Sequence, residues 1–473
     1  MIEPMSQQPA RPNIVVIMSD DHAAHAIGAY SSRVNTTPHI DRIAAAGMRF
    51  DDCFCTNAIC TPSRAAILTG EYNHVNGVRT LFDDLDNTRP QVQKELQQAG
   101  YATAIVGKWH LGHGPGHDPA GFDFWRVLPG QGDYNDPVLL GPDGEEHRRG
   151  YVTDIITDLS LGWLEQLDRE QPFMLMINHK APHRSWHPDP KHGHLYPEGT
   201  IPEPDTLADD HAGRADALAA LKMSMFDLDA EDLKQPVPPG LTHEQERSWR
   251  YQRYMSDYLR CIASVDDNVG RVLDWLDAHG LTDTTVVAYT SDQGFFLGDH
   301  GWFDKRLMYE ESLRMPLLVS YPPLVAPGSS TSDIVTNVDL APTLLDLAGA
   351  PLPERLQGHS MVDSLAGREP AHRQRDVYYR YWEHLSGPHE VPAHLGIRTD
   401  RFKLICYLKD ASTGGAPPSE IELYDLDADG AEMRNLYGDP GYDGVASDLL
   451  RRLRERQVEL GDEDVLTLPA GRG

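Results

Sequence analysis

The chain has 473 residues, which is long enough for a large buried core and a second, smaller domain. Its 40% hydrophobic content, with 40 Gly and 35 Pro, is typical of a loop-rich globular enzyme and excludes a disordered or fibrous chain. The 42 basic and 72 acidic residues give a net charge of −30, which disfavours binding to nucleic acid or to anionic membranes. An anionic substrate therefore has to be bound by a local group of cations.

The N-terminal segment predicts a soluble, cytoplasmic protein. Residues 1–13 are polar and carry an acid, and the first apolar run, Ile14–Met18, is too short for the core of a signal peptide. No apolar run approaches the length that spans a membrane.

Four apolar runs predict buried strands, and polar residues follow each of them. The runs are Ile14–Met18, the start of 101–112, the start of 172–183, and Thr284–Tyr289. The polar residues that follow are, in chain order, Ser19, Asp20, Asp21 and His22; Lys108 and His110; His179, Lys180 and His183; and Asp292 and Gln293.

Helical segments separate these strands. The predicted helices are His39–Ala46, Gln91–Ala99, Asp154–Leu167 and the long amphipathic segment Tyr254–His279. Alternation of strands and helices predicts an α/β fold with a mostly parallel, doubly wound sheet. Ligands bind beyond the carboxyl ends of the strands in such sheets, so the polar residues are expected to form one composite site.

The organisation changes after about residue 370. Residues 394–408 and 420–429 are predicted strands on either side of the turn 411–419, and Val445–Glu459 is a predicted closing helix. We therefore expect a catalytic domain over 1–370 and a smaller antiparallel α+β domain over 371–473. The stretch 191–242, rich in Pro, Asp and His, is expected to be an insertion over the site.

Oxygen ligands gather at two of the strand ends. Asp20 and Asp21 follow the first strand, and Asp292 and Gln293 follow the last. Three carboxylates brought close together repel one another unless a cation lies between them, and ligation by oxygen alone favours Ca²⁺ or Mg²⁺. The alternative is a pair of ordinary Asp-rich turns.

Cys60 opens the segment "CTPSRAAILTG". Pro62 suits the first turn of a helix that ends at Gly70, so Cys60 and Arg64 are expected at a helix N-terminus, where anions are favoured. The alternatives are a cysteine that only caps the helix and a simple thiol nucleophile. The five cysteines are too few for a disulfide framework and lack zinc-finger spacing.

Further titratable residues are weaker candidates when each is taken alone. Lys108 and His110 face the same way on an extended segment, and Lys305 lies shortly after the second pair of oxygen ligands. A single Lys or His in such a loop is usually solvated or structural. A histidine-rich stretch is as often a polar loop as a proton relay. The histidines of this stretch are His179, His183, His187, His192 and His194.

Together, these segments resemble the formylglycine-dependent sulfatases of the alkaline phosphatase superfamily. "CTPSRAAILTG" fits the specific signature of that family, and "PNIVVIMSDDH", "VGKWHLG", "KAPH", "TSDQG" and "DKRLMYEESLRMP" match its other blocks in order. The similarity covers residues 12–322, with a weaker match at "GIRTDRFKLI" and "ELYDL". "GMRFDDCF" through "YNHVNGV" and "LPGQGDY" look most like the branch acting on sulfated sugars, including glucosamine-6-sulfatases.

The resemblance implies a role for Cys60. In this family the matching cysteine is oxidised to Cα-formylglycine by a formylglycine-generating enzyme, and the aldehyde hydrate is the nucleophile. One hydroxyl attacks sulfur and the ester alcohol leaves, and the second hydroxyl then loses its proton so that the aldehyde re-forms and sulfate is expelled. A serine would lack the second oxygen and would trap the sulfate.

The resemblance also assigns the other matching positions. Asp20, Asp21, Asp292 and Gln293, with the modified Cys60, would hold one Ca²⁺, or Mg²⁺ as the second choice; Gln293 departs from the commoner Asn. Arg64, Lys108 and Lys305 would bind the hydrate and the sulfate oxygens. His110 would orient or deprotonate the hydrate, and His183 would be the acid for the leaving oxygen.

The resulting hypothesis is an exo-acting sulfatase that hydrolyses sulfate monoesters on small saccharides. Residues expected to contact sugar hydroxyls are Gln131, Asp133, His384 and His394. The alternatives are an arylsulfatase or a phosphonate or phosphate ester hydrolase on the same scaffold, and a binding protein that never receives the aldehyde. The sequence leaves the sugar, the sulfate position and the oligomeric state open.

Overall fold

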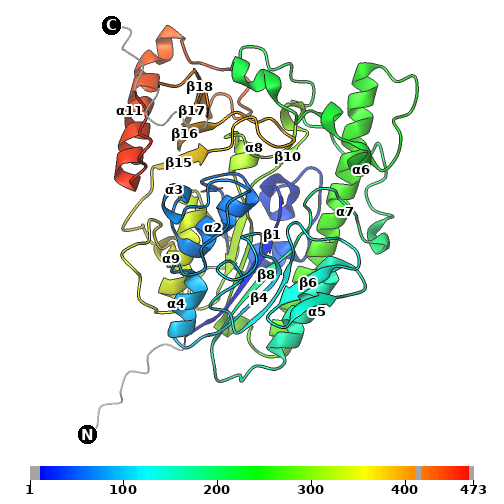
Figure 1. The fold of residues 1–473 in the computed structure, drawn as a ribbon, viewed down its shortest axis with the longest axis vertical. Helices are drawn as coiled ribbons and strands as arrows, with labels where there is room; N and C mark the ends of the chain where they lie inside the picture. Colours follow the sequence, from blue (N-terminus) through cyan, green and yellow to red (C-terminus); the bar gives the residue numbers. More distant parts are fainter. Residues whose placement is uncertain (1–10, 411–416, 468–473) are drawn as a thin grey trace.

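A large mixed sheet forms the centre of the computed structural model, which describes residues 11–410 and 417–467 (Figure 1). Its five central strands are parallel, whereas β12 and the β6–β7 pair run antiparallel to their neighbours. The strand order is β13 (Ser329–Thr331), β2 (Met48–Phe50), β12 (Leu317–Ser320), β9 (Thr285–Ser291), β1 (Asn13–Ser19), β8 (Phe173–Asn178), β4 (Ala102–Lys108), β5 (Phe124–Leu128), β6 (Val138–Gly141) and β7 (Gly144–His147).

Helices cover both faces of this sheet, so successive side chains of a central strand enter different cores. Val15 and Ile17 of β1 pack into a core shared with α1 (Ile40–Ala46), α5 (Val152–Leu164) and α7 (His243–Ala278). The alternate residues of β1 pack into a second core, which is shared with α2 (Cys60–Thr69), α4 (Val92–Gln98) and α9 (Leu340–Leu347). Burial on both faces explains why the central strands read as continuous apolar runs.

A second sheet is antiparallel and lies in the C-terminal part of the chain (Figure 1). Its strands are β15 (Asp376–Tyr381), β16 (His394–Thr399), β17 (Phe402–Tyr407) and β18 (Glu420–Asp425), and α11 (Asp443–Leu460) packs against them. The predicted fold class is confirmed. The domain limits remain a prediction, and residues 411–416 of the predicted turn lie outside the described residues.

The remaining elements are short. They are β3 (Cys53–Phe54), β10 (Phe296–Leu297), β11 (Phe303–Asp304), β14 (Val335–Thr336), α3 (Asn73–Asn76), α6 (Ala230–Leu233), α8 (Glu310–Leu313) and α10 (Val362–Leu365). Over 191–242 the chain forms only α6 and short 3-10 turns. This stretch reaches the loop before Lys305, because Met223 accepts a backbone hydrogen bond from Phe303 at 2.8 Å.

The longest helix begins well before the position expected from its apolar pattern. Thr242 accepts a hydrogen bond from the backbone N–H of Gln245 at 3.2 Å, and the Gln245 side chain accepts one from the Thr242 N–H at 2.9 Å. This capping box starts α7 at His243, ahead of the first strongly apolar turn. None of the helices within 11–410 and 417–467 combines the length and the apolar character needed to cross a membrane.

Candidate active site

Two neighbouring strands bring the predicted oxygen ligands together. β1 and β9 pair in parallel register with Ser19 opposite Ser291, so the residues that follow each strand emerge side by side. Asp20, Asp21 and Asp292 have no exposed surface, and one carboxylate oxygen of each lies within 4.8 Å of the others. The sheet register therefore creates a buried cluster of three carboxylates.

The charge state of this cluster depends on its burial and on nearby cations. Burial raises the pKa of Asp21 to about 7 and also raises the pKa of Asp292. Burial alone would raise the pKa of Asp20 too, but neighbouring cations, led by Lys108, hold it well below its ordinary value. The negative charge of Asp20 in turn helps to raise the pKa of both Asp21 and Asp292.

The donor atoms in this cluster fit a divalent cation. Asp20 Oδ1 and Gln293 Oε1 are buried and have no hydrogen-bond partner in the described chain. The Gln293 amide donates to Asp21 Oδ1 at 2.5 Å, which directs its own oxygen away from that carboxylate. Unsatisfied buried acceptors beside three carboxylates are what an ion with oxygen ligands would satisfy.

Three buried cations surround the carboxylates. Arg64 donates to Asp292 Oδ2 at 3.0 Å and to Asp20 Oδ2 at 3.2 Å, and its third bond, at 2.9 Å, goes to the Lys108 carbonyl. The Lys108 ammonium pairs with Asp20. Lys305 donates to both oxygens of Asp21, at 2.6 and 2.8 Å. These are the cations predicted to bind sulfate, and the fold brings all of them to one centre.

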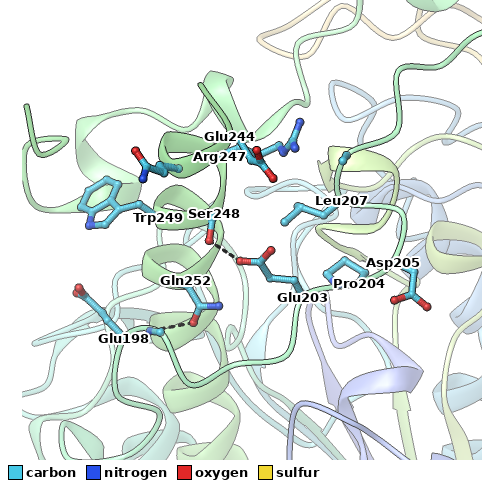
Figure 2. Close-up of a pocket in the computed structure, with 13 residues that line it drawn as sticks. Glu198, Glu203, Pro204, Asp205, Leu207, Glu244, Arg247, Ser248, Trp249 and Gln252 are labelled. Carbon is cyan, nitrogen blue, oxygen red and sulfur yellow. Dashed lines mark hydrogen bonds between the residues drawn. The ribbon is translucent and has the colours of Figure 1, made fainter. Parts of the chain in front are cut away.

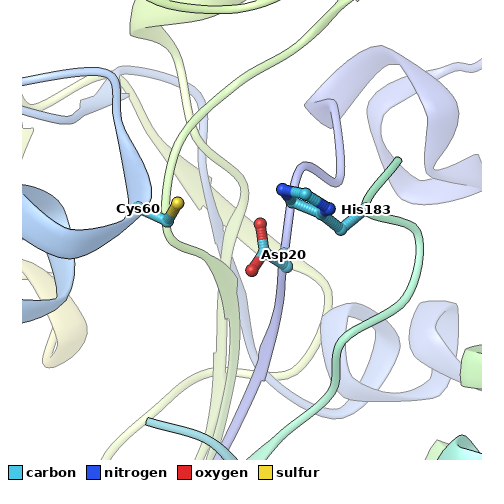
Figure 3. A group of neighbouring side chains, drawn as sticks. All are labelled: Asp20, Cys60 and His183. Carbon is cyan, nitrogen blue, oxygen red and sulfur yellow. The ribbon is translucent and has the colours of Figure 1, made fainter. Parts of the chain in front are cut away.

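Cys60 lies at the start of α2, as its sequence context predicted. The helix ends at Gly70, whose φ of +65° is a backbone conformation that favours glycine. The Cys60 sulfur, an Asp20 oxygen and a His183 ring nitrogen lie within 4.8 Å of one another (Figure 3). Burial raises the pKa of the Cys60 thiol, which disfavours an unmodified thiolate nucleophile.

Two histidines complete the centre, and burial favours the neutral form of both rings. Burial and then Lys108 lower the pKa of His110 to about 2 and that of His183 well below its ordinary value. His110 Nδ1 lies 3.3 Å from the Thr61 hydroxyl. His183 Nδ1 lies 2.5 Å from the Arg184 carbonyl, which fixes its proton there and turns Nε2 toward Asp21 at 3.9 Å.

A network of charged residues next to Lys305 was not predicted from the sequence. Asp304 pairs with Arg306 at 3.1 Å and with His389 at 3.2 Å, and Arg306 lies 3.6 Å from Glu383. This network ties the loop after β15 to the segment that carries Lys305. The charged residues on both sides of Lys305 were the only sequence signal for it.

The residues predicted to contact the sugar differ in their placement. Gln131 belongs to the centre, because its amide oxygen accepts a hydrogen bond from Lys108 at 2.5 Å. Asp133 is exposed, and His384 accepts a backbone hydrogen bond from Ala393 at 3.2 Å.

His394 is not brought into the cluster. Its ring is fully buried, its Nδ1 lies 2.8 Å from the Pro392 carbonyl, and Tyr379, Tyr381 and Tyr407 surround it. The geometry does not support the expected contact of His394 with a sugar hydroxyl, because three tyrosine rings pack against the buried imidazole.

A separate cavity of about 710 Å³ lies between 191–242 and the start of α7 (Figure 2). Carboxylates dominate its charged lining, with Glu198, Glu203, Asp205 and Glu244 facing the single cation Arg247. None of the predicted catalytic or metal-binding residues lines it. Its acidic lining does not suit an anionic substrate.

Comparisons with known proteins agree with this geometry. Residues 12–350 match the family "Sulfatase", and residues 298–459 match "N-sulphoglucosamine sulphohydrolase, C-terminal". The chain belongs to the sulfatase family. This sulfatase is 40% identical to N-acetylglucosamine-6-O-sulfatase of Bacteroides thetaiotaomicron. The alignment is 507 positions long and covers 98% of the chain and 89% of that relative. Human N-acetylglucosamine-6-sulfatase is 27% identical over 396 residues, covering 78% of the chain and 67% of the human protein.

Solved structures give the same result. A protein solved in complex with its substrate D-glucosamine-2-N,6-O-disulfate superposes with a TM-score of 0.91 at 40% identity, covering 96% of this chain and 99% of the other. The phosphonate monoester hydrolase of Agrobacterium radiobacter superposes with a TM-score of 0.75 at 21% identity, covering 95% and 96%, and shares the fold. The predicted resemblance to carbohydrate sulfatases is thereby confirmed, and sulfatases generally use a metal ion and formylglycine.

Proposed function

We propose that this sulfatase removes the 6-O-sulfate from a glucosamine-type residue at the end of a small saccharide. The observation that carries the proposal is the position of Cys60, beside Asp20 and His183 and next to the three-carboxylate cluster. The support for the sugar is the 40% identity to a relative named for N-acetylglucosamine-6-O-sulfate.

We assign Asp20, Asp21, Asp292 and Gln293 as the residues that hold one Ca²⁺. The ion would supply Lewis acidity, lowering the pKa of a hydroxyl group and neutralising charge on the sulfate. An all-oxygen ligand set with a neutral amide favours Ca²⁺ over softer metals.

The proposed nucleophile is the hydrate of formylglycine at position 60, made by a formylglycine-generating enzyme during maturation. One hydroxyl of the hydrate would attack sulfur as the bond from sulfur to the sugar oxygen breaks, and the second hydroxyl would then lose its proton so that the aldehyde re-forms and sulfate leaves. His110 contacts the first turn of α2 through Thr61, where it can accept a proton from this hydrate.

The remaining residues bind and transfer protons. Lys108, Arg64 and Lys305 provide fixed positive charge for the sulfate oxygens in a site from which bulk water is excluded. His183 presents Nε2 to the centre, and a proton there makes the ring a cation. The negative charge of a bound sulfate would raise the pKa of His183 from its lowered value, and this would favour the protonated ring that the leaving oxygen needs.

Paired substrates test this function. Enzyme produced together with a formylglycine-generating enzyme should release sulfate from N-acetylglucosamine-6-sulfate, and Cys60→Ala should abolish the reaction. Mass spectrometry of the peptide containing residue 60 should show the aldehyde. Faster turnover of an aryl phosphodiester than of the matched sulfate would instead support the phosphonate or phosphate ester hydrolase. An unmodified Cys60, with binding but no turnover, would support a binding protein.

A further inference from the structure

Lys180 is a buried cation beside the centre that the proposed mechanism does not use. It follows β8, and its residue is 4% exposed. Its ammonium has no hydrogen bond or ion pair with any residue of 11–410 and 417–467, and it lies over the ring of Tyr134, 4.8 Å from the ring centroid. The cations of the centre differ from it, because Arg64, Lys108 and Lys305 are all paired with carboxylates.

The backbone fixes Lys180 next to catalytic groups. The adjoining carbonyl, that of Ala181, accepts a hydrogen bond from the Asp20 N–H at 3.4 Å. Tyr134, on whose face the ammonium lies, donates its hydroxyl to the His183 carbonyl at 2.6 Å. The ammonium therefore lies over a tyrosine ring whose hydroxyl contacts the backbone of His183.

No carboxylate in the described part of the chain is close enough to pair with this ammonium. Burial lowers its pKa to about 8, and repulsion from Lys108 adds to this, so the group is still mostly charged at neutral pH. The other titratable groups that act on it are Asp20, Cys261 and Asp133. A buried ammonium that repels a neighbouring cation is stabilised when an anion binds between or beside them.

We propose that Lys180 is a substrate-binding residue whose ammonium contacts a sulfate group of the sugar on the His183 side of the centre. This inference rests on the proposed function, because it requires a sulfated substrate at this site. The sulfate has two possible sources: the group being transferred, or a second sulfate such as one on the glucosamine nitrogen.

Two substrates distinguish these sources. Lys180→Met keeps an unbranched side chain and removes the charge, and Lys180→Arg retains a charge. We expect Lys180→Met to lower kcat/KM by about 10- to 100-fold, as for loss of a hydrogen bond to a charged group. A loss with both N-acetylglucosamine-6-sulfate and glucosamine-2-N,6-O-disulfate identifies the transferred sulfate. A loss with the disulfate alone identifies the second sulfate.

Controls separate this contact from a structural role. Lys191→Met, at an exposed lysine that pairs with Asp154 at 3.3 Å, should keep the wild-type kcat/KM. Lys180→Arg should recover part of the loss. If Lys180→Met retains kcat/KM within about twofold on both sugars, a difference too small for a lost charged contact, the inference is wrong.

A measurement on the unaltered enzyme does not depend on turnover or on a folded variant. Inorganic sulfate should slow the reductive methylation of Lys180 relative to that of Lys191, as read by peptide mass spectrometry. Equal labelling with and without sulfate would overturn the inference. Failure of the wild-type enzyme to hydrolyse either sugar would refute the proposed function instead, and the labelling result would still stand.

Discussion

Replacing Arg64 tests whether the carboxylate cluster depends on its buried cations. Arg64 has 2% exposure and donates three hydrogen bonds, two of them to the buried carboxylates of Asp20 and Asp292. In Arg64→Met, both acids would lose a charged partner and remain in the interior. Breaking a buried ion pair by removing one partner costs about 3–5 kcal/mol, so we expect a loss of unfolding free energy of that size.

An exposed pair provides the matched control. Arg42 bonds Asp274 at 2.8 Å, but the two side chains are 42% and 69% exposed, so Arg42→Met should cost only about 0–1 kcal/mol. Urea unfolding, followed by circular dichroism in buffer that contains a chelator, measures the free energy of unfolding of both variants. The comparison requires that the slope of this free energy against urea concentration is the same for both. Adding Ca²⁺ should recover more stability for Arg64→Met than for wild type, because an ion would offset the unpaired carboxylates. Equal losses for the two variants would refute the reasoning.

Three further predictions concern the nucleophile, the ion ligand and a buried acid. Cys60→Ser should give at most one turnover and retain sulfate on the serine, detectable by intact mass; continued turnover would contradict the need for a second oxygen. Gln293→Leu should weaken Ca²⁺ binding at least about tenfold in calorimetry, whereas Gln293→Asn should bind it, and equal affinities would exclude this residue as a ligand. Burial raises the pKa of Asp266 to about 6, although its carboxylate accepts the backbone N–H groups of His39 and Ile40. The folded state therefore binds the Asp266 proton more tightly than the unfolded state does. Protonated Asp266 should add about 3 kcal/mol to the free energy of unfolding below pH 4, and this contribution should be lost as the pH rises through about 6. Asp266→Asn should flatten that part of the stability profile, and an unchanged profile would contradict the assignment.

The sequence was most informative where local pattern and burial agree. The central strands are buried on both faces, so their apolar runs alone located them, and the polar residues that follow mark one edge of the sheet. Pro62 correctly marked the first turn of α2, which begins at Cys60. These features depend on near neighbours in the chain.

Features that depend on distant partners were not predictable in this way. β15 carries Arg380 inside a fully buried strand, and that burial requires Asp462, whose carboxylate pairs with Arg380 at 2.7 Å. The same holds for Glu383 and His389, which reach the Lys305 segment only through folding. The sequence also did not show that three distant tyrosines, Tyr379, Tyr381 and Tyr407, pack around the ring of His394.

The ladder between β1 and β9 keeps the ligands that follow these two strands together when the length of a connecting loop changes. Seven pairs in register, from Asn13 with Thr285 to Ser19 with Ser291, hold the two ligand-bearing ends level. Insertions in the loops between these strands leave that alignment intact. One residue added within either strand would shift its acids by about 3.3 Å and turn them to the opposite face of the sheet. The chain could therefore be opened and rejoined at an exposed loop, as in a circular permutant, without separating Asp20 from Asp292.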